Sequence, residues 1–168
     1  MSSVKVTIHN SSELNNLSDQ VVKSVTDLIF VSECCNDLTS LNLNRFIKLE
    51  TIEIGDDCFE NVDIFRIDGL NELKSLEIGG NSFNHVKKDD VDMEELVELA
   101  NNTSRSFHLL NCIELESIEI ESHSFCDYGG GFELVNLPKL STIKMDSLNF
   151  MCSSFVIKGI IDDDNAIE

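Results

Sequence analysis

The sequence predicts a β-rich solenoid, a coil of short strands in which each turn stacks on the one before it. The first observation is a column of aliphatic residues that returns every 24 positions and then continues with two changes of spacing. Its members are Val4, Leu28, Ile52, Leu76, Ile118 and Ile143. A second column follows two residues later, at Val6, Phe30, Ile54, Ile78, Ile120 and Met145. Because fixed periods of about 20–50 residues are typical of repeat architectures, we expect one domain over residues 1–168.

Each repeat contains a strand with one buried face. In the segment Leu49–Ile54 the apolar residues stand at the first, fourth and sixth positions, and the last two alternate with Glu53. Alternation with a period of two is typical of a strand that buries one side. The same spacing recurs in the segments that end at Ile78, Ile120 and Met145, and in weaker form in those that end at Val6 and Phe30.

Two further columns predict an aromatic core and a second strand in each turn. A phenylalanine stands ten residues after the first leucine of the repeat, at Phe59, Phe83, Phe125 and Phe150, with Cys35 in the earlier turn. We expect these rings to stack inside the coil. The second strand is predicted at residues 65–67, 107–109, 132–134 and 155–157, with residues 41–43 in the earlier turn. Glycine, asparagine and aspartate mark the corners between strands.

The pattern Leu49-x-x-Ile52-x-Ile54 followed by Phe59 resembles a leucine-rich repeat, and in particular the BspA-like branch of microbes and protists. The resemblance covers roughly residues 25–160. It implies a right-handed leucine-rich repeat solenoid with about 24 residues per coil, whose sheet forms a concave surface that grips ligands. Two departures stand out: the asparagine that classical repeats place after the strand is largely missing, and a long insertion interrupts the array.

The chain divides into four parts. Residues 1–24 are predicted to form an N-terminal repeat or cap, with a helical crossover for which Ser11 or Ser12 is the expected N-cap. Residues 25–160 form the repeats, and residues 161–168 form an acidic tail that blocks further stacking. A helical insertion is predicted at residues 85–106, because Met93, Leu96, Val97 and Ala100 have the spacing of one helix face. This helix packs on its own repeat or, alternatively, contacts a partner.

The net charge of −19, from 31 acidic and 12 basic residues, argues against nucleic acid and anionic membranes as partners, because both would be repelled. No run of apolar residues is long enough to span a bilayer. The N-terminus has no signal-peptide pattern, so we expect a cytoplasmic protein whose 6 cysteines are free thiols.

The exposed side of the first strand supplies the candidate binding residues. Glu53, Glu77, Glu119 and Lys144 lie between the two buried columns, in line with Lys5 and Ile29 of the earlier turns. A neighbouring column contains Thr51, Ser75 and Ser117. Strands of a sheet lie about 4.8 Å apart, so three aligned glutamates form either a solvated face or a surface for a basic protein partner.

Metal and catalytic sites are less favoured. The acidic clusters at residues 89–92 and 162–165 offer oxygen ligands for calcium but lack the spacing of a calcium loop. The pairs His108/Cys112 and His123/Cys126 are incomplete as zinc sites. Gly129–Gly131 is interpreted as a flexible corner, because no lysine or helix start follows it. We therefore expect no cofactor and no enzymatic activity.

The favoured function is a monomeric, non-catalytic protein–protein interaction module that presents an acidic concave sheet. One alternative is a structural segment of a larger repeat array. A more remote alternative is a metal-dependent enzyme.

Overall fold

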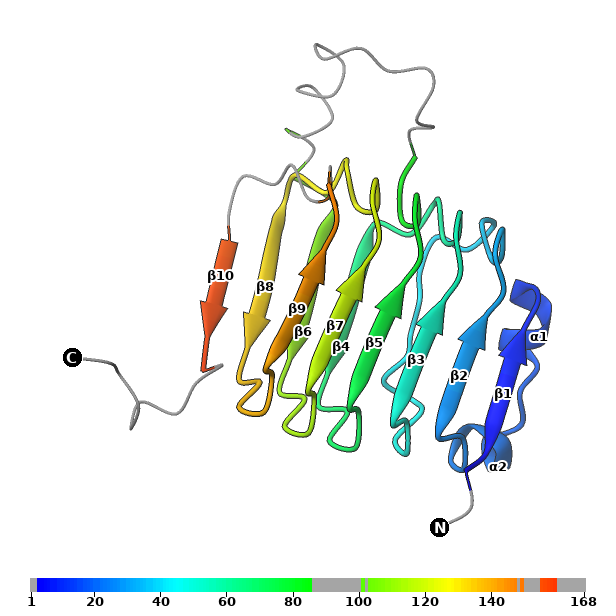
Figure 1. The fold of residues 1–168 in the computed structure, drawn as a ribbon. Coiled ribbons are helices and arrows are strands. Elements are labelled where there is room, and N and C mark those ends of the chain that lie inside the picture. Colours follow the sequence, from blue (N-terminus) through cyan, green and yellow to red (C-terminus); the bar gives the residue numbers. More distant parts are fainter. Residues whose placement is uncertain (1–2, 86–100, 102, 148, 150–154, 160–168) are drawn as a thin grey trace.

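The predicted solenoid is confirmed: the computed structural model is a coil of about five turns built from parallel strands, with very little helix (Figure 1). The structure describes residues 3–85, 101, 103–147, 149 and 155–159. The chain alternates between two sheets on opposite sides of the coil. Figure 1 shows that the strands of one sheet run opposite to those of the other, as expected for a chain that winds around a common core.

We call the six-stranded sheet sheet A and the four-stranded one sheet B. Sheet A consists of β1 (Lys5–Ile8), β2 (Asp27–Phe30), β3 (Thr51–Ile54), β5 (Ser75–Ile78), β7 (Ser117–Ile120) and β9 (Thr142–Met145), in that spatial order. Sheet B consists of β4 (Ile64–Asp68), β6 (Ser106–Leu110), β8 (Gly131–Val135) and β10 (Phe155–Lys158), also in chain order. Every pairing is parallel.

The register of sheet A keeps the two apolar columns on the inside. Leu28 pairs with Ile52, Ile52 with Leu76, and the column continues through Ile118 to Ile143. The interior members of this column are at most 1% exposed. Because side chains alternate across a strand, the residues between them point outward. The row of outward residues on sheet A is therefore fixed by the burial of its neighbours.

The predicted alignment of the first strand is wrong by two residues. Val6, and not Val4, pairs with Leu28, and Ile8 pairs with Phe30. Ile8 is 1% exposed. A shift of two residues leaves the same side chains facing inward, so the alternation in the sequence cannot distinguish the two registers. The offset between β1 and β2 is also shorter, at 22 residues against 24 between β2 and β3, and two small helices occupy this turn.

These helices are α1 (Ser11–Asn15) and α2 (Asp19–Val22), which lie beside β1 in Figure 1. The predicted helical crossover is thus present, but it is broken in two, and its first N-cap lies one residue earlier than predicted. Asn10, and not Ser11 or Ser12, accepts a hydrogen bond from the Glu13 amide as the cap of α1. Ser18 does the same for Val21 at the start of α2. Leu14 and Val22 are buried and close this end of the core.

The expected aromatic column is present at Phe59, Phe83 and Phe125, whose rings stack at centroid distances of 5.1 and 4.7 Å. A second ladder runs along sheet B, where Phe107 stacks on Phe65 at 4.9 Å and on Phe132 at 5.0 Å. Edge contacts between the two ladders, such as those of Phe107 and Phe125, join them into one core. Phe150 lies outside the described residues.

The phenylalanine column stands at an unusual backbone position. Phe59, Phe83 and Phe125 have φ values of 58°, 55° and 58°, in the left-handed region that bulky residues rarely adopt. The residue two positions earlier is also left-handed in each turn, as with Asn81 at 57°. The three rings are fully buried, so their packing offsets a local strain on the order of 1–3 kcal/mol per residue.

A column of buried hydrogen-bonding side chains precedes the phenylalanines and was missed by the sequence analysis. The Ser82 hydroxyl accepts a hydrogen bond from the Cys58 amide (3.0 Å) and donates to the Gly55 carbonyl (2.9 Å). Ser124 repeats this arrangement one turn later. In the earlier turn the Cys58 thiol accepts from the Cys34 amide and donates to a carbonyl. The column satisfies backbone groups that the corners leave unpaired.

Two other expectations change. Residues 41–43 do not join sheet B, although Leu43 is buried. The predicted insertion at residues 85–106 and the tail at residues 161–168 fall largely or wholly outside the described residues. At the C-terminal base of the insertion, Ser106 already begins β6.

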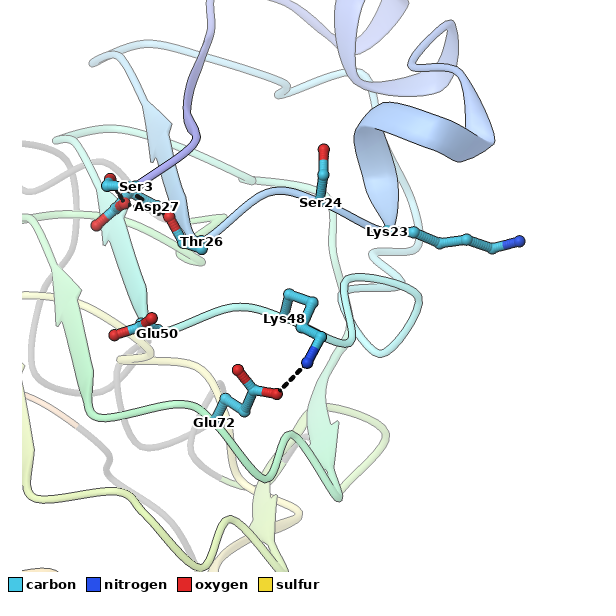
Figure 2. Close-up of a pocket in the computed structure, with 8 residues that line it drawn as sticks. All are labelled: Ser3, Lys23, Ser24, Thr26, Asp27, Lys48, Glu50 and Glu72. Atoms are coloured by element: carbon cyan, nitrogen blue, oxygen red, sulfur yellow. Dashed lines mark hydrogen bonds and ion pairs between the residues drawn. The ribbon is translucent and has the colours of Figure 1, made fainter. Parts of the chain in front are cut away.

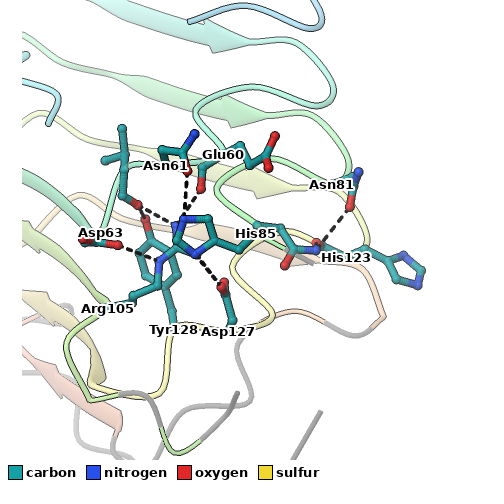
Figure 3. A network of polar contacts seen from close by, with 11 residues as sticks. Glu60, Asn61, Asp63, Asn81, His85, Arg105, His123, Asp127 and Tyr128 are labelled. Atoms are coloured by element: carbon teal, nitrogen blue, oxygen red, sulfur yellow. Dashed lines mark hydrogen bonds and ion pairs between the residues drawn. The ribbon is translucent and has the colours of Figure 1, made fainter. Parts of the chain in front are cut away.

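Figure 3 shows the polar network at this base, centred on the fully buried Arg105. Its guanidinium donates to the carbonyls of Glu60 and Val62 at 3.0 and 2.8 Å and pairs with the buried Asp127. It also lies 4.7 Å from the centroid of the Tyr128 ring. The network ties three successive turns together where the insertion interrupts the repeat.

The glycine run beside this network is a point of close packing, which overturns its interpretation as a flexible corner. The Gly130 amide donates to the Arg105 carbonyl at 2.8 Å. A Cβ atom at Gly130 would lie 2.4 Å from the Thr103 carbonyl oxygen. Only glycine fits there, because both neighbours are backbone atoms that cannot move aside.

Candidate functional site

The outer face of sheet A carries the predicted row of charges, which we call the acidic row. The register places Glu53 directly beside Glu77, Glu77 beside Glu119, and Glu119 beside Lys144. All four are exposed. The Lys144 ammonium lies 3.2 Å from a Glu119 carboxylate oxygen. Within the described part of the chain, neither Glu53 nor Glu77 has an ion-pair partner.

The neighbouring polar row is also aligned, in the order Asp27, Thr51, Ser75, Ser117 and Thr142. At its start, Asp27 accepts hydrogen bonds from Ser3, Thr26 and Thr51. These bonds, with that of Ser3 the largest contribution, lower the pKa of the Asp27 carboxyl below its usual value. The polar row is thus internally bonded at its N-terminal end, whereas the acidic row is open to solvent.

The shift in register changes the first members of both rows. Lys5 lies beside Asp27 in the polar row, and Thr7 takes the place beside Ile29 where Lys5 was predicted. The cation at this end of the sheet therefore compensates Asp27, to whose lowered pKa it contributes. It does not extend the acidic row.

Two shallow hollows lie over this face. One, of about 200 Å³, is lined by Glu53, Glu77 and Glu119 together with Asp56 and Glu121 at the strand ends. The other, of about 220 Å³, lies between Lys5, Asp27, Thr51 and Glu53. Neither is enclosed by apolar walls, so the face offers charge and hydrogen-bonding groups over an open surface and not a closed pocket.

A larger hollow, of about 400 Å³, lies elsewhere, at the corners that precede the sheet A strands (Figure 2). It is lined by Ser3, Lys23, Ser24, Thr26, Asp27, Lys48, Glu50 and Glu72. Lys48 and Glu72 form an ion pair across it at 2.6 Å, and Glu50 is held by Lys74 at 2.5 Å. Because its three carboxylates are already ion-paired or hydrogen-bonded, this hollow has fewer open acidic groups to offer a ligand than the acidic row.

In the two histidine–cysteine pairs considered for zinc, His108 makes other contacts and both cysteines are buried. The two ring nitrogens of His108 face Glu133 at 2.7 Å and Ser106 at 2.8 Å. Burial raises the pKa of the Cys112 and Cys126 thiols to about 11, which disfavours the thiolates that metals require. Among the described residues no group of three histidine, cysteine or acidic side chains could hold a metal ion. The two acidic clusters considered for calcium lie outside the described residues.

The remaining described cysteines gather in one place. The Cys34 and Cys35 sulfur atoms are 2.8 Å apart, and Cys58 lies in the next turn. Burial raises the pKa of Cys58 to about 12 and shifts those of Cys34 and Cys35 upward as well. As expected, all five described cysteines are free. Cys34 and Cys58 are core residues that also hydrogen-bond to the backbone, and Cys35 is a buried core residue.

No protein-family model matches the sequence, and no curated protein or solved structure matches it at a significant level. The fold assignment accordingly rests on the strands and their register. Helices long and apolar enough to cross a membrane are absent from the part of the chain that the structure describes.

Proposed function

We propose that this protein is a non-catalytic recognition module of the leucine-rich repeat type, related to the BspA-like branch, and that its acidic row binds a protein with a basic surface. The observation that carries this proposal is the register that aligns Glu53, Glu77 and Glu119 on adjacent strands. We further propose that the protein acts in the cytoplasm as a monomer.

Electrostatics supports a basic partner. Carboxylates on neighbouring strands about 4.8 Å apart repel one another, and a lysine or arginine placed between them would relieve this repulsion. The chain as a whole carries a net charge of −19, which attracts a basic partner from a distance and speeds association. Thr51, Ser75 and Ser117 add hydrogen-bonding groups one row away.

The test is a charge reversal of the acidic row, with Glu53→Lys, Glu77→Lys and Glu119→Lys in one variant. Binding partners of the intact chain are selected from a displayed library of lysine- and arginine-rich peptides, and the affinity of a selected peptide is measured by fluorescence anisotropy. We expect the triple variant to lose at least tenfold in affinity, about 1.4 kcal/mol. Binding to the intact protein should also weaken as salt is raised.

The matched control reverses three carboxylates away from this face, with Glu72→Lys, Glu114→Lys and Glu133→Lys. Each of these glutamates is partly exposed, and its reversal breaks one surface ion pair that contributes at most about 1 kcal/mol to stability. The control has the same net charge as the first variant and should keep the affinity of the intact protein. Equal losses in both variants would show that only net charge matters. A folded chain that selects no peptide would favour a structural role.

A further inference from the structure

The last strand of sheet A differs from the interior strands in that its inward side chains are uncovered. Ile143 and Met145 of β9 are 40% and 42% exposed, whereas Ile118 and Ile120 at the same positions of β7 are 0% and 1% exposed. On β10, the edge strand of sheet B at the same end of the coil, Phe155 is 55% exposed. Burying an aliphatic side chain of this size contributes about 1.5–3 kcal/mol. The edge therefore gains from an added strand.

The backbone of this edge is also prepared for another strand. In each earlier turn the carbonyl just before the sheet A strand accepts hydrogen bonds from two amides of the next turn. The Glu116 carbonyl, for example, accepts from the Ser141 and Thr142 amides. A second carbonyl at the strand end accepts one more, as Ile120 accepts from Asp146. The equivalent carbonyls on β9 are those of Ser141 and Met145. Neither receives an amide from the described residues, so within this part of the chain both are left for a parallel strand.

The positive charge of Lys144 at this edge favours an added strand that carries an acidic residue. The acidic row ends at Lys144, whose side chain is 64% exposed and touches Glu119 on one side only. A carboxylate on an added strand would contact the other side of this ammonium. A basic residue there would repel it.

We propose that the β9 edge binds an extended segment of a partner protein, in parallel, with an acidic residue between two aliphatic residues. The aliphatic residues cover Ile143 and Met145, the acidic residue pairs with Lys144, and the amides bond to the Ser141 and Met145 carbonyls. This is recognition by strand addition. This strand would bind at the Lys144 end of the acidic row, beyond the three glutamates. Its acidic character is opposite to that of the basic partner proposed for Glu53, Glu77 and Glu119.

A second copy of this chain fits the edge less well. Stacked head to tail, its β1 would place Thr7, and not an acidic residue, beside Lys144, because Thr7 occupies this row in the first turn. Lys5 lies two residues away on the same outer face. The pairing would therefore lack the charge that the edge selects.

The test uses an eight-residue fluorescein-labelled peptide with the sequence of residues 114–121, which has the required pattern, and a second peptide with lysine in place of the residue equivalent to Glu119. Anisotropy with the full chain should show at least tenfold tighter binding of the acidic peptide. In the Lys144→Glu variant the preference should reverse. Lys74→Glu reverses a lysine of an interior turn whose side chain is 50% exposed, and it should leave the preference unaltered.

Equal affinity for the two peptides, or no binding of either to the folded chain, would overturn the proposal. A preference that persists in Lys144→Glu would also overturn it, because the acidic peptide would then bind elsewhere. Sedimentation velocity on the chain alone tests whether the edge binds a second copy of the chain. Concentration-dependent assembly that is abolished by Met145→Lys would assign the edge to a second copy instead.

Discussion

At the scale of single residues, the buried column of Cys34, Cys58, Ser82 and Ser124 shows how one position can be served by two residue types. Thiol and hydroxyl both accept a hydrogen bond from the preceding turn and donate to a carbonyl. Burial keeps the Cys58 thiol protonated, with a pKa raised to about 12. The cysteines there are best understood as stand-ins for serine within the fold.

This equivalence predicts that Cys58→Ser is tolerated and Cys58→Ala is not. Serine keeps both the donor and the acceptor, so we expect a loss of less than about 1 kcal/mol in the free energy of unfolding. Alanine leaves the Cys34 amide and the Val31 carbonyl without their buried partner, at a cost of about 1–3 kcal/mol. Urea denaturation of the two variants measures the difference. Equal losses would mean that volume, and not hydrogen bonding, decides this position.

At the scale of elements, the regular register of sheet A places like charges side by side. Glu77 lies between Glu53 and Glu119, and among the residues that the structure describes only Glu119 of these three has a cation beside it. Such pairs destabilise a sheet and are screened by salt, since the Debye length falls to about 3 Å at 1 M. The proposed binding to a basic partner would give these repelling charges a role.

We therefore predict that Glu77→Gln stabilises the protein by about 0.2–1 kcal/mol at low salt. The substitution keeps the size of the side chain and removes the central charge of the row. Thermal unfolding at 20 mM and 1 M sodium chloride measures the effect, which should largely vanish at the higher concentration. Glu72→Gln, which breaks the ion pair with Lys48, is the control and should not stabilise. A gain for Glu77→Gln that is independent of salt would contradict the repulsion.

At the scale of the whole molecule, the coil continues across an interruption. Consecutive sheet A strands are offset by 24 residues between β3 and β5 but by 42 between β5 and β7, and the register is nevertheless unbroken. Arg105 explains how the turns on either side are held, because it contacts the backbone at Glu60 and Val62 and the side chain of Asp127. One buried cation thus links segments that the insertion separates in sequence.

Arg105→Leu should accordingly cost about 3–5 kcal/mol of unfolding free energy, because it removes the buried guanidinium that pairs with the buried Asp127 and leaves only the half-exposed His85 at 3.4 Å. Adding Asp127→Leu should recover part of this loss, since the second change removes the orphaned charge. Chemical denaturation of the single and double variants measures both values. Lys139→Ala, which breaks an exposed pair with Glu114, should cost less than about 1 kcal/mol. If Arg105→Leu also costs less than about 1 kcal/mol, Arg105 does not hold the neighbouring turns together.

The sequence by itself determined the coil, its strands and its aromatic column, because the burial of a repeated face imposes a repeated pattern of apolar residues. It also placed Glu53, Glu77 and Glu119 in one row, since a fixed offset between strands aligns every position of the repeat. The register of β1, however, depends on backbone contacts that alternation alone cannot resolve. The roles of Arg105, Gly130 and the Cys58–Ser82 column likewise arise only when distant turns meet. The uncovered β9 edge is a property of the stack, because exposure depends on which neighbours a strand has and not on its own residues.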